Sequence, residues 1–232
     1  MRQNNLTRPE TIVVVAMSAD GKIAEAARNQ VLFGSPADKA HLEAQVAAAD
    51  GVIFGAGTLR AGGSAMRVTH PELLKQREEQ GKPSQPVQIV CSRSGNIEPN
   101  LKFFQQPIPR WLLTTASGQS RWREQLGFEQ ILALETPQQE IDLPAALQHL
   151  ATLGLERLAV LGGGTLIASL VAADLIDQLW ITVCPLILGG ATAPTPTDGD
   201  GFLTEQAPRL ELLEVKPVGQ EVFLHYRRQR DE

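Results

Sequence analysis

Three consecutive glycines, Gly162, Gly163 and Gly164, separate two apolar segments of the chain. Residues 158–161 predict a short buried strand, and residues 165–171 predict the opening of a helix. The first amide groups of a helix have no partner within it and lie at the positive end of its dipole, so a phosphate could bind there. Glycine would let the anion approach the backbone, because a Cβ atom would hold it away. The alternative is a bend that only lets strand and helix pack closely.

A second glycine-containing bend follows the apolar residues 52–54. Gly55 and Gly57 flank an alanine, Thr58 adds a hydroxyl group, and Arg60 adds a positive charge. These groups could hold another phosphate oxygen, but bends of this kind are also common where nothing binds. Together, the two bends predict a dinucleotide held by two separate strand–helix turns.

Neither bend has the Rossmann fingerprint, because Arg60 and Ile167 stand where the third glycine is required. A third strand end, at residues 92–94, places the hydroxyl groups of Ser92 and Ser94 beside Arg93. Such a group is suited to the 2′-phosphate that distinguishes NADPH from NADH. Taken alone, it is more typical of a solvated turn.

The composition limits the possible partners. The chain has 232 residues, 43% of them hydrophobic, and a net charge of −5 without a basic block, which argues against a nucleic-acid surface. No apolar run approaches the ~18 residues of a membrane span, and the run after residues 1–9 is too short for a signal peptide, so we expect a cytoplasmic protein. The four histidines are isolated, and we expect no metal site. Cys91 and Cys184 are expected to be reduced core thiols.

Strands and helices alternate along most of the chain, which predicts an α/β fold. Residues 209–215 and 221–227 instead alternate in period two and predict an antiparallel pair joined near residues 217–219. We therefore predict one domain over residues 1–232, with a mainly parallel central sheet, an antiparallel C-terminal strand pair and helices on both faces. The other strands are expected at residues 11–17, 51–55, 87–92, 111–114, 130–134, 158–161 and 178–183.

Helix boundaries follow from capping residues and apolar spacing. Ser35 and Pro36 predict the start of a helix whose apolar face holds Leu42, Val46 and Ala49. Ser117 is expected to cap a short helix that ends at Leu126. A further helix opens at Asp142, with Leu147, Leu150 and Leu153 inward and Gly154 as its C-cap. Residues 71–86 and 192–201 are expected to be polar loops.

Several motifs occur here in a familiar order. They are Met-Ser-Ala-Asp-Gly-Lys-Ile-Ala at 17–24, the two glycine bends, and Asp-Gln-Leu at 177–179 leading to Pro-Leu-Ile-Leu-Gly-Gly at 185–190. From about residue 10 to 227 the chain resembles the reductase domain of the bifunctional riboflavin-biosynthesis deaminase–reductase, a member of the dihydrofolate-reductase-like superfamily. The zinc-binding deaminase signature is absent, so we expect a stand-alone reductase domain.

The resemblance implies a dihydrofolate-reductase-like fold, NADPH as hydride donor, a phosphorylated small-molecule substrate and a homodimer. The implied reaction is that of 5-amino-6-(5-phosphoribosylamino)uracil reductase, in which hydride adds to the ribose carbonyl or imine carbon. Trp180, Phe223 and Tyr226 are candidates for an interface, and they could equally be core residues.

Site residues are carried over by position. Lys22 would project into the substrate cleft, and Asp20 would orient it or relay a proton, unless Asp20 only forms the turn before Gly21. Ser35 and Arg67 would contact the substrate. The resemblance assigns the cofactor to Ala16, Ala24, Thr58, Ser92, Gly162, Gly163, Gly164, Thr165, Leu166 and Ile167, with the two alanines beside the nicotinamide.

The chain departs from the family pattern on the substrate side. Gly62, Val46 and Leu161 stand where the family usually has Asp, Arg and Glu. Two alternatives therefore stay open, namely a related NADPH-dependent reductase with a different small substrate and a non-catalytic NADP-binding protein. A folate-like substrate is disfavoured, because Asp38 and Glu43, the only carboxylates of the first helix, are not clearly placed to meet a pterin.

Overall fold

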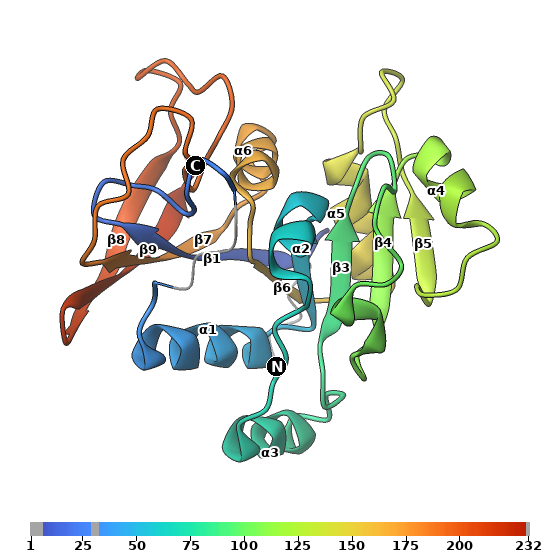
Figure 1. Ribbon diagram of the computed structural model, residues 1–232, viewed down its shortest axis with the longest axis horizontal. Helices are drawn as coiled ribbons and strands as arrows, with labels where there is room; N and C mark the ends of the chain where they lie inside the picture. The colour runs from blue at the N-terminus through green and yellow to red at the C-terminus, as the bar shows by residue number, and fades with distance from the viewer. Residues whose placement is uncertain (1–6, 29–32, 231–232) are drawn as a thin grey trace.

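The computed structural model describes residues 7–28 and 33–230, so residues 1–6 of the N-terminal segment lie outside the described residues. Its nine strands form one sheet in the order β5-β4-β3-β2-β6-β1-β7-β9-β8 (Figure 1). The strands are β1 (Glu10–Ser18), β2 (Gly51–Gly55), β3 (Val87–Cys91), β4 (Arg110–Thr114), β5 (Gln130–Ala133), β6 (Arg157–Val160), β7 (Gln178–Cys184), β8 (Arg209–Val218) and β9 (Glu221–Gln229).

The sheet is mainly parallel, as predicted. Neighbouring strands from β5 to β7 run parallel, whereas β9 is antiparallel to both β7 and β8. The hairpin between β8 and β9 turns at Gly219, whose φ of +62° lies in the region that favours glycine. The C-terminal antiparallel pair expected from the alternating sequence is thereby confirmed.

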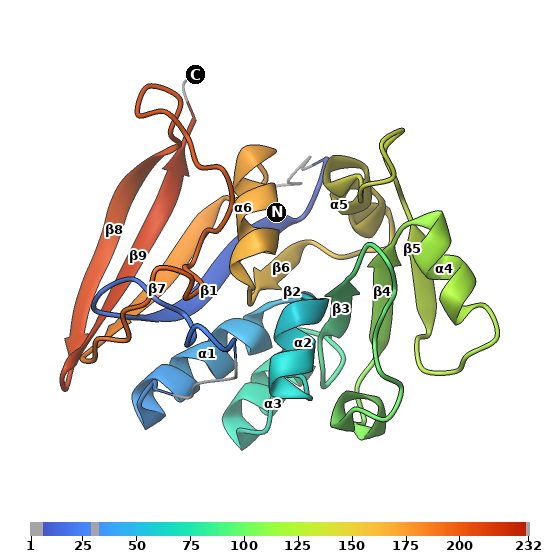
Figure 2. The ribbon, with the colours of Figure 1, turned by 45° about the horizontal axis from the view of Figure 1, so that its top comes forward.

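Helices cover both faces of the sheet (Figure 2). They are α1 (Pro36–Ala48), α2 (Ala56–Gly62), α3 (Pro71–Glu79), α4 (Ala116–Trp122), α5 (Leu143–Thr152), α6 (Gly164–Ala172) and the short 3₁₀ helix η1 (Lys102–Gln105). Successive side chains of β2 point to opposite faces of the sheet, which explains why the helices form two layers. Ile53 packs with α5 and α6, whereas Val52 and Phe54 pack with α1 and α2.

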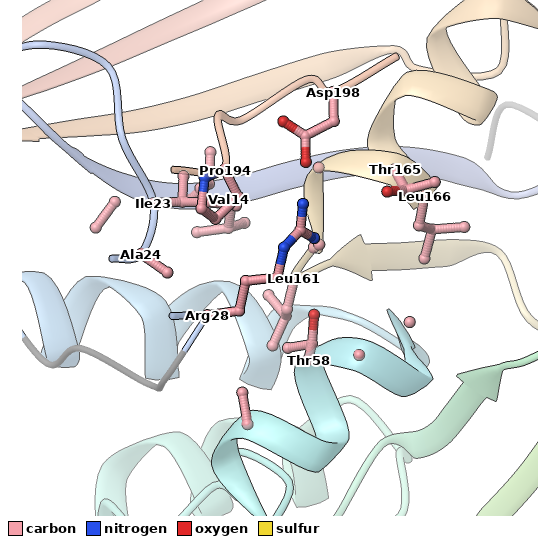
Figure 3. Close-up of a pocket in the computed structure, with 18 of the residues that line it drawn as sticks. Val14, Ile23, Ala24, Arg28, Thr58, Leu161, Thr165, Leu166, Pro194 and Asp198 are labelled. Carbon is pink, nitrogen blue, oxygen red and sulfur yellow. The ribbon is translucent and has the colours of Figure 1, made fainter. Parts of the chain in front are cut away.

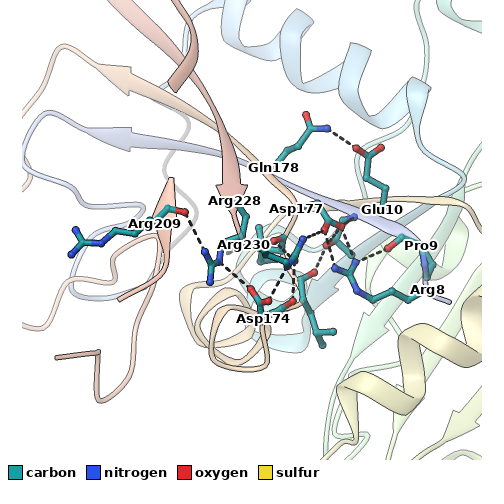
Figure 4. Close-up of polar contacts among 12 residues, drawn as sticks. Arg8, Pro9, Glu10, Asp174, Asp177, Gln178, Arg209, Arg228 and Arg230 are labelled. Carbon is teal, nitrogen blue, oxygen red and sulfur yellow. Dashed lines mark hydrogen bonds and ion pairs between the residues drawn. The ribbon is translucent and has the colours of Figure 1, made fainter. Parts of the chain in front are cut away.

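An ionic junction joins both ends of the chain to the start of β7 (Figure 4). The Asp177 carboxylate accepts hydrogen bonds from Arg8 and Arg230, each at 2.8 Å, and from the backbone N–H of Thr11 at 2.9 Å. Asp174 accepts from Arg228 and Arg230. The aspartate of the Asp-Gln-Leu motif thus connects β1, β7 and the end of β9, away from the glycine bends.

The expectation of a loop over residues 71–86 was wrong, because α3 occupies residues 71–79. Its sequence is mostly polar and does not indicate how the helix packs. Arg77 is 1% exposed and donates hydrogen bonds to the carbonyl groups of Ala47, Ala49 and Pro83. Hydrogen bonds from Arg77 to the end of α1 therefore hold α3 in place, where a helix is usually held by a stripe of apolar side chains.

Two other helix ends differ from the sequence prediction. Thr115 rather than Ser117 caps α4, which ends at Trp122, and Leu126 is exposed beyond it. Leu153 lies at the C-cap of α5 and is 39% exposed, because the helix turns away from the sheet there, and Gly154 follows with a φ of +86°. The caps expected at Ser35 and Asp142 are confirmed.

Three further features bear on function. Cys184 is buried and Cys91 half-buried, and both are free thiols. No helix in residues 7–28 and 33–230 is long and apolar enough to cross a membrane. Within the same ranges, no group of three or more His, Cys, Asp or Glu side chains is placed to hold a metal ion.

Candidate active site

The two glycine bends lie side by side at the carboxyl ends of β2 and β6. The backbone N–H of Gly55 donates a hydrogen bond of 2.8 Å to the carbonyl oxygen of Gly162. Gly162 has a φ of +101°, which a side chain would strain. The Thr58 hydroxyl, in the first turns of α2, lies against Gly163, the N-cap of α6. The two turns predicted from separate parts of the sequence are therefore one structural unit.

A cavity of about 360 Å³, the inner cavity, opens over this unit (Figure 3). The side of the cavity that could accept an anion is lined by Thr58, the three glycines and the start of α6. The opposite side is apolar and includes Ala16, Ile23 and Ala24. The structure thus brings together most of the sequence-predicted cofactor residues, and Ile167 lies behind them as a fully buried core residue of α6.

Sequence reasoning missed several residues of the inner cavity, among them two charged ones. Arg28, Pro194 and Asp198 line it, and Figure 3 shows the Arg28 side chain extending into it. Asp198 accepts hydrogen bonds from the backbone N–H and hydroxyl of Thr195, both at 2.9 Å. A Cβ added to Gly164 would lie 2.3 Å from the Thr195 carbonyl oxygen, so this loop packs directly on α6. The loop expected at residues 192–201 is confirmed, but its place over α6 depends on the fold and has no local sequence signal.

A second cavity of about 690 Å³, the outer cavity, adjoins the first. Both cavities share a wall formed by Ala16, Ile23, Leu42, Thr58 and Leu161. Beyond this wall, the outer cavity is lined by both polar and apolar side chains. They include Phe33, Ser35, Asp38, Lys39, Phe54, Ser64 and Met66.

Ser35 lines the outer cavity with its hydroxyl already engaged. The hydroxyl donates a 2.6 Å hydrogen bond to Glu221 Oε2, and Ser35 Oγ accepts from the backbone N–H groups of Ala37 and Asp38. The Ser35 backbone N–H also donates to Glu221 Oε1, at 2.7 Å. Glu221 is only 4% exposed and lies at the start of β9. Ser35 therefore anchors α1 to the C-terminal hairpin at the edge of the outer cavity.

Asp38, one turn further along α1, also lines the outer cavity. Burial raises the pKa of its carboxyl group above the usual 3.8, and the nearby Glu221 carboxylate adds to the effect, while a hydrogen bond with Thr182 opposes it. Of the two acids of this helix, only Asp38 is among the residues that line the two cavities. Glu43 faces elsewhere and accepts from the backbone N–H of His70 at 2.7 Å.

Asp20 and Lys22 lie in the turn after β1, next to the cavity residues Ile23 and Ala24. The Asp20 carboxylate accepts from the hydroxyl of Ser18 at 2.6 Å and from the backbone N–H groups of Leu188 and Gly189 at 3.1 and 2.7 Å. These contacts lower its pKa to about 2, the Ser18 hydrogen bond having the largest effect. A group this acidic is a poor proton relay near neutral pH, which favours its turn-forming role.

Lys22 places its Nζ atom 3.5 Å from the carbonyl oxygen of Ala193, beside Pro194 of the inner cavity. Its ammonium group therefore lies next to the cavity lining. Besides Ile167, four of the predicted site residues are not among those that line the two cavities, namely Asp20, Lys22, Arg67 and Ser92. The expectation that Lys22 projects into the substrate cleft is therefore not supported. Ser92 is buried at the end of β3, and the neighbouring Arg93 pairs with Glu140.

The three departures from the family pattern have different surroundings. Val46 is fully buried in the core, so its side chain does not reach the outer cavity. Leu161 stands on the shared wall and makes it apolar where a carboxylate was expected. Gly62 ends α2 and adds no side chain. The cofactor side therefore keeps its pattern, and the substrate side has a different set of polar groups.

Comparison with known proteins identifies the family of this chain. Residues 9–224 match the family described as the RibD C-terminal domain. The chain belongs to this family. It is 30% identical over 209 residues to 2,5-diamino-6-ribosylamino-4(3H)-pyrimidinone 5′-phosphate reductase of Archaeoglobus fulgidus, a match that covers 89% of this chain and 93% of the relative. The RibD C-terminal domain family thus comprises reductases of riboflavin biosynthesis, which confirms the prediction of that activity.

Full-length RibD proteins are longer than this chain. The match to RibD of Escherichia coli, at 25% identity, covers 90% of this chain and 57% of that protein. Among solved structures, RibD of Acinetobacter baumannii has a TM-score of 0.79 at 22% identity, covering 97% of this chain and 59% of that one. Enterococcus faecalis dihydrofolate reductase, complexed with NADP(H), has a TM-score of 0.53 at 13% identity, covering 95% and 97%. These likenesses confirm the dihydrofolate-reductase-like fold.

Proposed function

We propose that this chain is an NADPH-dependent reductase that acts on a ribosylaminopyrimidine 5′-phosphate in riboflavin biosynthesis. The observation that carries the proposal is the pair of glycine bends, tied at Gly55 and Gly162, beneath an inner cavity that opens into a larger outer one. Relatives named as pyrimidinone phosphate reductases support the substrate class.

The inner cavity has the groups that a phosphorylated dinucleotide needs. The start of α6 offers unpaired backbone N–H groups, Thr58 offers a hydroxyl, and Arg28 offers a positive charge. Gly163 leaves the approach open, because a Cβ there would lie 3.2 Å from Thr58 Oγ1. The apolar side with Ala16 and Ala24 suits a nicotinamide ring. When bound, NADPH supplies a hydride.

The outer cavity would hold the substrate. Its ribose opens to an imine at C1′, hydride adds to that carbon, and a proton adds to the nitrogen, which leaves a ribitylamino chain. C1′ would then lie at the shared wall, between the two cavities. Lys39 lines the outer cavity with an exposed ammonium group, so it is suited to the 5′-phosphate, and Lys22 adds positive charge at the rim. Arg67, which lines neither cavity, is a weaker candidate for that role.

Turnover with defined substrates tests the proposal. NADPH oxidation is followed at its absorbance band with the diaminopyrimidinone, the aminouracil and dihydrofolate as separate substrates. We expect oxidation with a ribosylaminopyrimidine phosphate and none with dihydrofolate. Calorimetric titration of NADPH and NADH should show tighter binding of NADPH. Tight NADPH binding without any turnover would instead identify the chain as a non-catalytic nucleotide-binding protein.

A homodimer remains part of the proposal. Strand β8 lies at one edge of the sheet and exposes Leu210, Leu212 and Val215, each at least 40% accessible. Phe223 is buried within the subunit, and Trp180 stacks on His225 with ring centroids 4.0 Å apart. The exposed leucines of β8 are therefore better interface candidates than the aromatic residues considered first. Sedimentation velocity gives the oligomeric state directly.

A further inference from the structure

One side of the outer cavity is formed by a segment that belongs to no helix or strand. This segment, residues 64–70, runs from the end of α2 to the start of α3. Three of its members line the cavity, namely Ser64, Ala65 and Met66. The glycine pair at 62–63 precedes it, and glycine loses more conformational freedom on folding than any other residue. The position of the segment therefore depends on contacts from elsewhere in the chain.

Side-chain amides take the place of a neighbouring strand along this segment. Gln106 Oε1 accepts a 2.8 Å hydrogen bond from the backbone N–H of Ala65, and Gln106 Nε2 donates to the Ala65 carbonyl oxygen at 3.0 Å. Gln85 makes the same pair of hydrogen bonds with the backbone of Val68, at 3.0 and 2.8 Å. A primary amide presents an acceptor and a donor side by side, so it can pair with both backbone groups of one residue. Two glutamines therefore hold the segment at two separate points.

The two glutamines hold different parts of the segment. Ala65 lies between the lining residues Ser64 and Met66, so its partner Gln106 fixes the part that borders the outer cavity. Val68, the partner of Gln85, is 2% exposed and packs in the core, and it is not among the residues that line the cavity. The contact at Ala65 therefore bears on the shape of the cavity, whereas the contact at Val68 bears mainly on the fold.

Gln106 is itself held in place by the short helix η1, which it directly follows. Its backbone N–H donates to the Phe103 carbonyl oxygen at 3.3 Å, and its own carbonyl oxygen accepts from Arg110 at 2.6 Å. Phe103 is fully buried, meets the ring of Phe54 edge to face, and donates its backbone N–H to the Gly63 carbonyl oxygen at 2.9 Å. Phe54 in turn lines the outer cavity. Helix η1 and Gln106 thus connect the core to the start of residues 64–70.

We propose that Gln106 is a positioning residue that sets the affinity of the outer cavity for its substrate without touching that substrate. This inference rests on the proposed function and deepens it by naming a residue that prepares the substrate site. Gln106 is not among the residues that line either cavity, so it acts through Ala65. When the segment is already ordered, binding does not have to order it, so the loss of Gln106 weakens substrate binding. The cofactor would lie beyond the shared wall and is unaffected.

Gln106→Met removes both hydrogen bonds and keeps a side chain of similar length. With 2,5-diamino-6-ribosylamino-4(3H)-pyrimidinone 5′-phosphate and 5-amino-6-(5-phosphoribosylamino)uracil assayed in turn, we expect KM for the reduced pyrimidine to rise about tenfold. The values of kcat and of the NADPH Kd should change little. Gln85→Met makes the same change at Val68 and is the matched control, because Glu43 still accepts hydrogen bonds from Thr69 there. It should lower the melting temperature by a similar amount and leave KM unchanged.

Gln106→Glu gives a readout that a merely structural role would not move. A protonated carboxyl group has a donor and an acceptor, as the amide has, whereas the ionised group only accepts and would lie against the Ala65 carbonyl oxygen. The ratio of KM in this variant to KM in wild type should therefore rise as the new carboxyl group ionises, from close to unity at about pH 5 to about tenfold at about pH 8. Gln85→Glu should show no such pH dependence.

Hydrogen exchange and binding are measured separately from turnover. By NMR, Gln106→Met should speed exchange of the Ala65 amide hydrogen, and Gln85→Met should speed that of Val68. Slow exchange at Ala65 in Gln106→Met would overturn the inference, because the contact would not order the segment. Calorimetric titration of each pyrimidine into the complex with NADP⁺, which cannot donate hydride, should give a Kd about tenfold higher for Gln106→Met than for wild type.

The outcomes separate the two claims. Binding about tenfold weaker in Gln106→Met than in wild type, with no turnover in either protein, refutes the proposed reductase function and supports the role of Gln106. Turnover with the same KM in wild type and Gln106→Met, or with KM raised equally in both methionine variants, overturns the role of Gln106 and leaves the reductase function standing. Failure of wild type to bind either pyrimidine overturns both.

Discussion

The Cα atom of Gly163 faces the side chain of Thr58 so closely that a Cβ atom there would lie 3.2 Å from Thr58 Oγ1. Gly163 has an extended backbone, with φ of −77° and ψ of −179°, which any residue can adopt. The lack of a side chain at this position is therefore a matter of space above the bend rather than of backbone conformation.

Gly163→Val should raise the Kd for NADPH by about tenfold or more, because the branched side chain would fill the phosphate approach. Calorimetric titration measures the effect, and circular dichroism checks the fold. Ala172→Val adds the same side chain at the exposed end of α6 and serves as the control. An unchanged Kd for NADPH in a folded Gly163→Val protein would show that no phosphate of the cofactor binds at this bend.

Lys22→Ala should reduce kcat roughly a hundredfold while changing the NADPH Kd little, because the ammonium group is expected to act on the substrate. Steady-state kinetics and calorimetry on the same preparation measure both quantities. Lys75→Ala on α3, where the lysine is exposed, is the matched control. Equal losses of turnover and cofactor affinity would assign Lys22 to the cofactor or to folding.

Asp20→Asn should lower the melting temperature at pH 6 more than at pH 2.5. The folded pKa of about 2 lies below the usual 3.8, so the carboxylate stabilises the fold above pH 3.8 and loses that contribution as the pH falls towards 2. Thermal unfolding of both proteins across this range measures the difference. A constant difference in melting temperature would show that the charge on Asp20 does not stabilise the turn.

Arg77→Met should reduce the free energy of unfolding by about 2–4 kcal/mol, because the carbonyl groups of Ala47 and Ala49, in buried hydrogen bonds, and that of Pro83 lose their donor. Urea denaturation followed by tryptophan fluorescence measures the loss. Arg123→Met replaces an exposed arginine and should have little effect. Equal stability of the two variants would mean that water or nearby N–H groups satisfy the carbonyls.

Features defined by neighbouring residues were predictable from the sequence. The strand–glycine–helix order predicted both glycine bends. Ser35 and Asp142 predicted helix starts, because capping depends on the next three residues. The antiparallel hairpin was also predictable, because the period-two pattern on both sides of Gly219 is a local feature of the sequence.

Features defined by distant residues were not predictable in this way. Helix α3 depends on Arg77 reaching carbonyl groups of α1, which no local apolar pattern reveals. The surroundings of Asp38 include Thr182, which the sheet brings near it from far along the chain. Arg28 and Asp198 line the inner cavity only because the loops that carry them fold over it.

The shared wall between the two cavities has a consequence for how reduction is completed. Of its five members, Ala16, Ile23, Leu42 and Leu161 have no exchangeable side-chain hydrogen, and Thr58 is a very weak acid. No carboxyl, imidazole or ammonium group belongs to that wall. In the proposed reaction, the proton that the reduced nitrogen takes up therefore comes from solvent or from a group beyond this wall, and deuterium from D₂O should not appear at C1′.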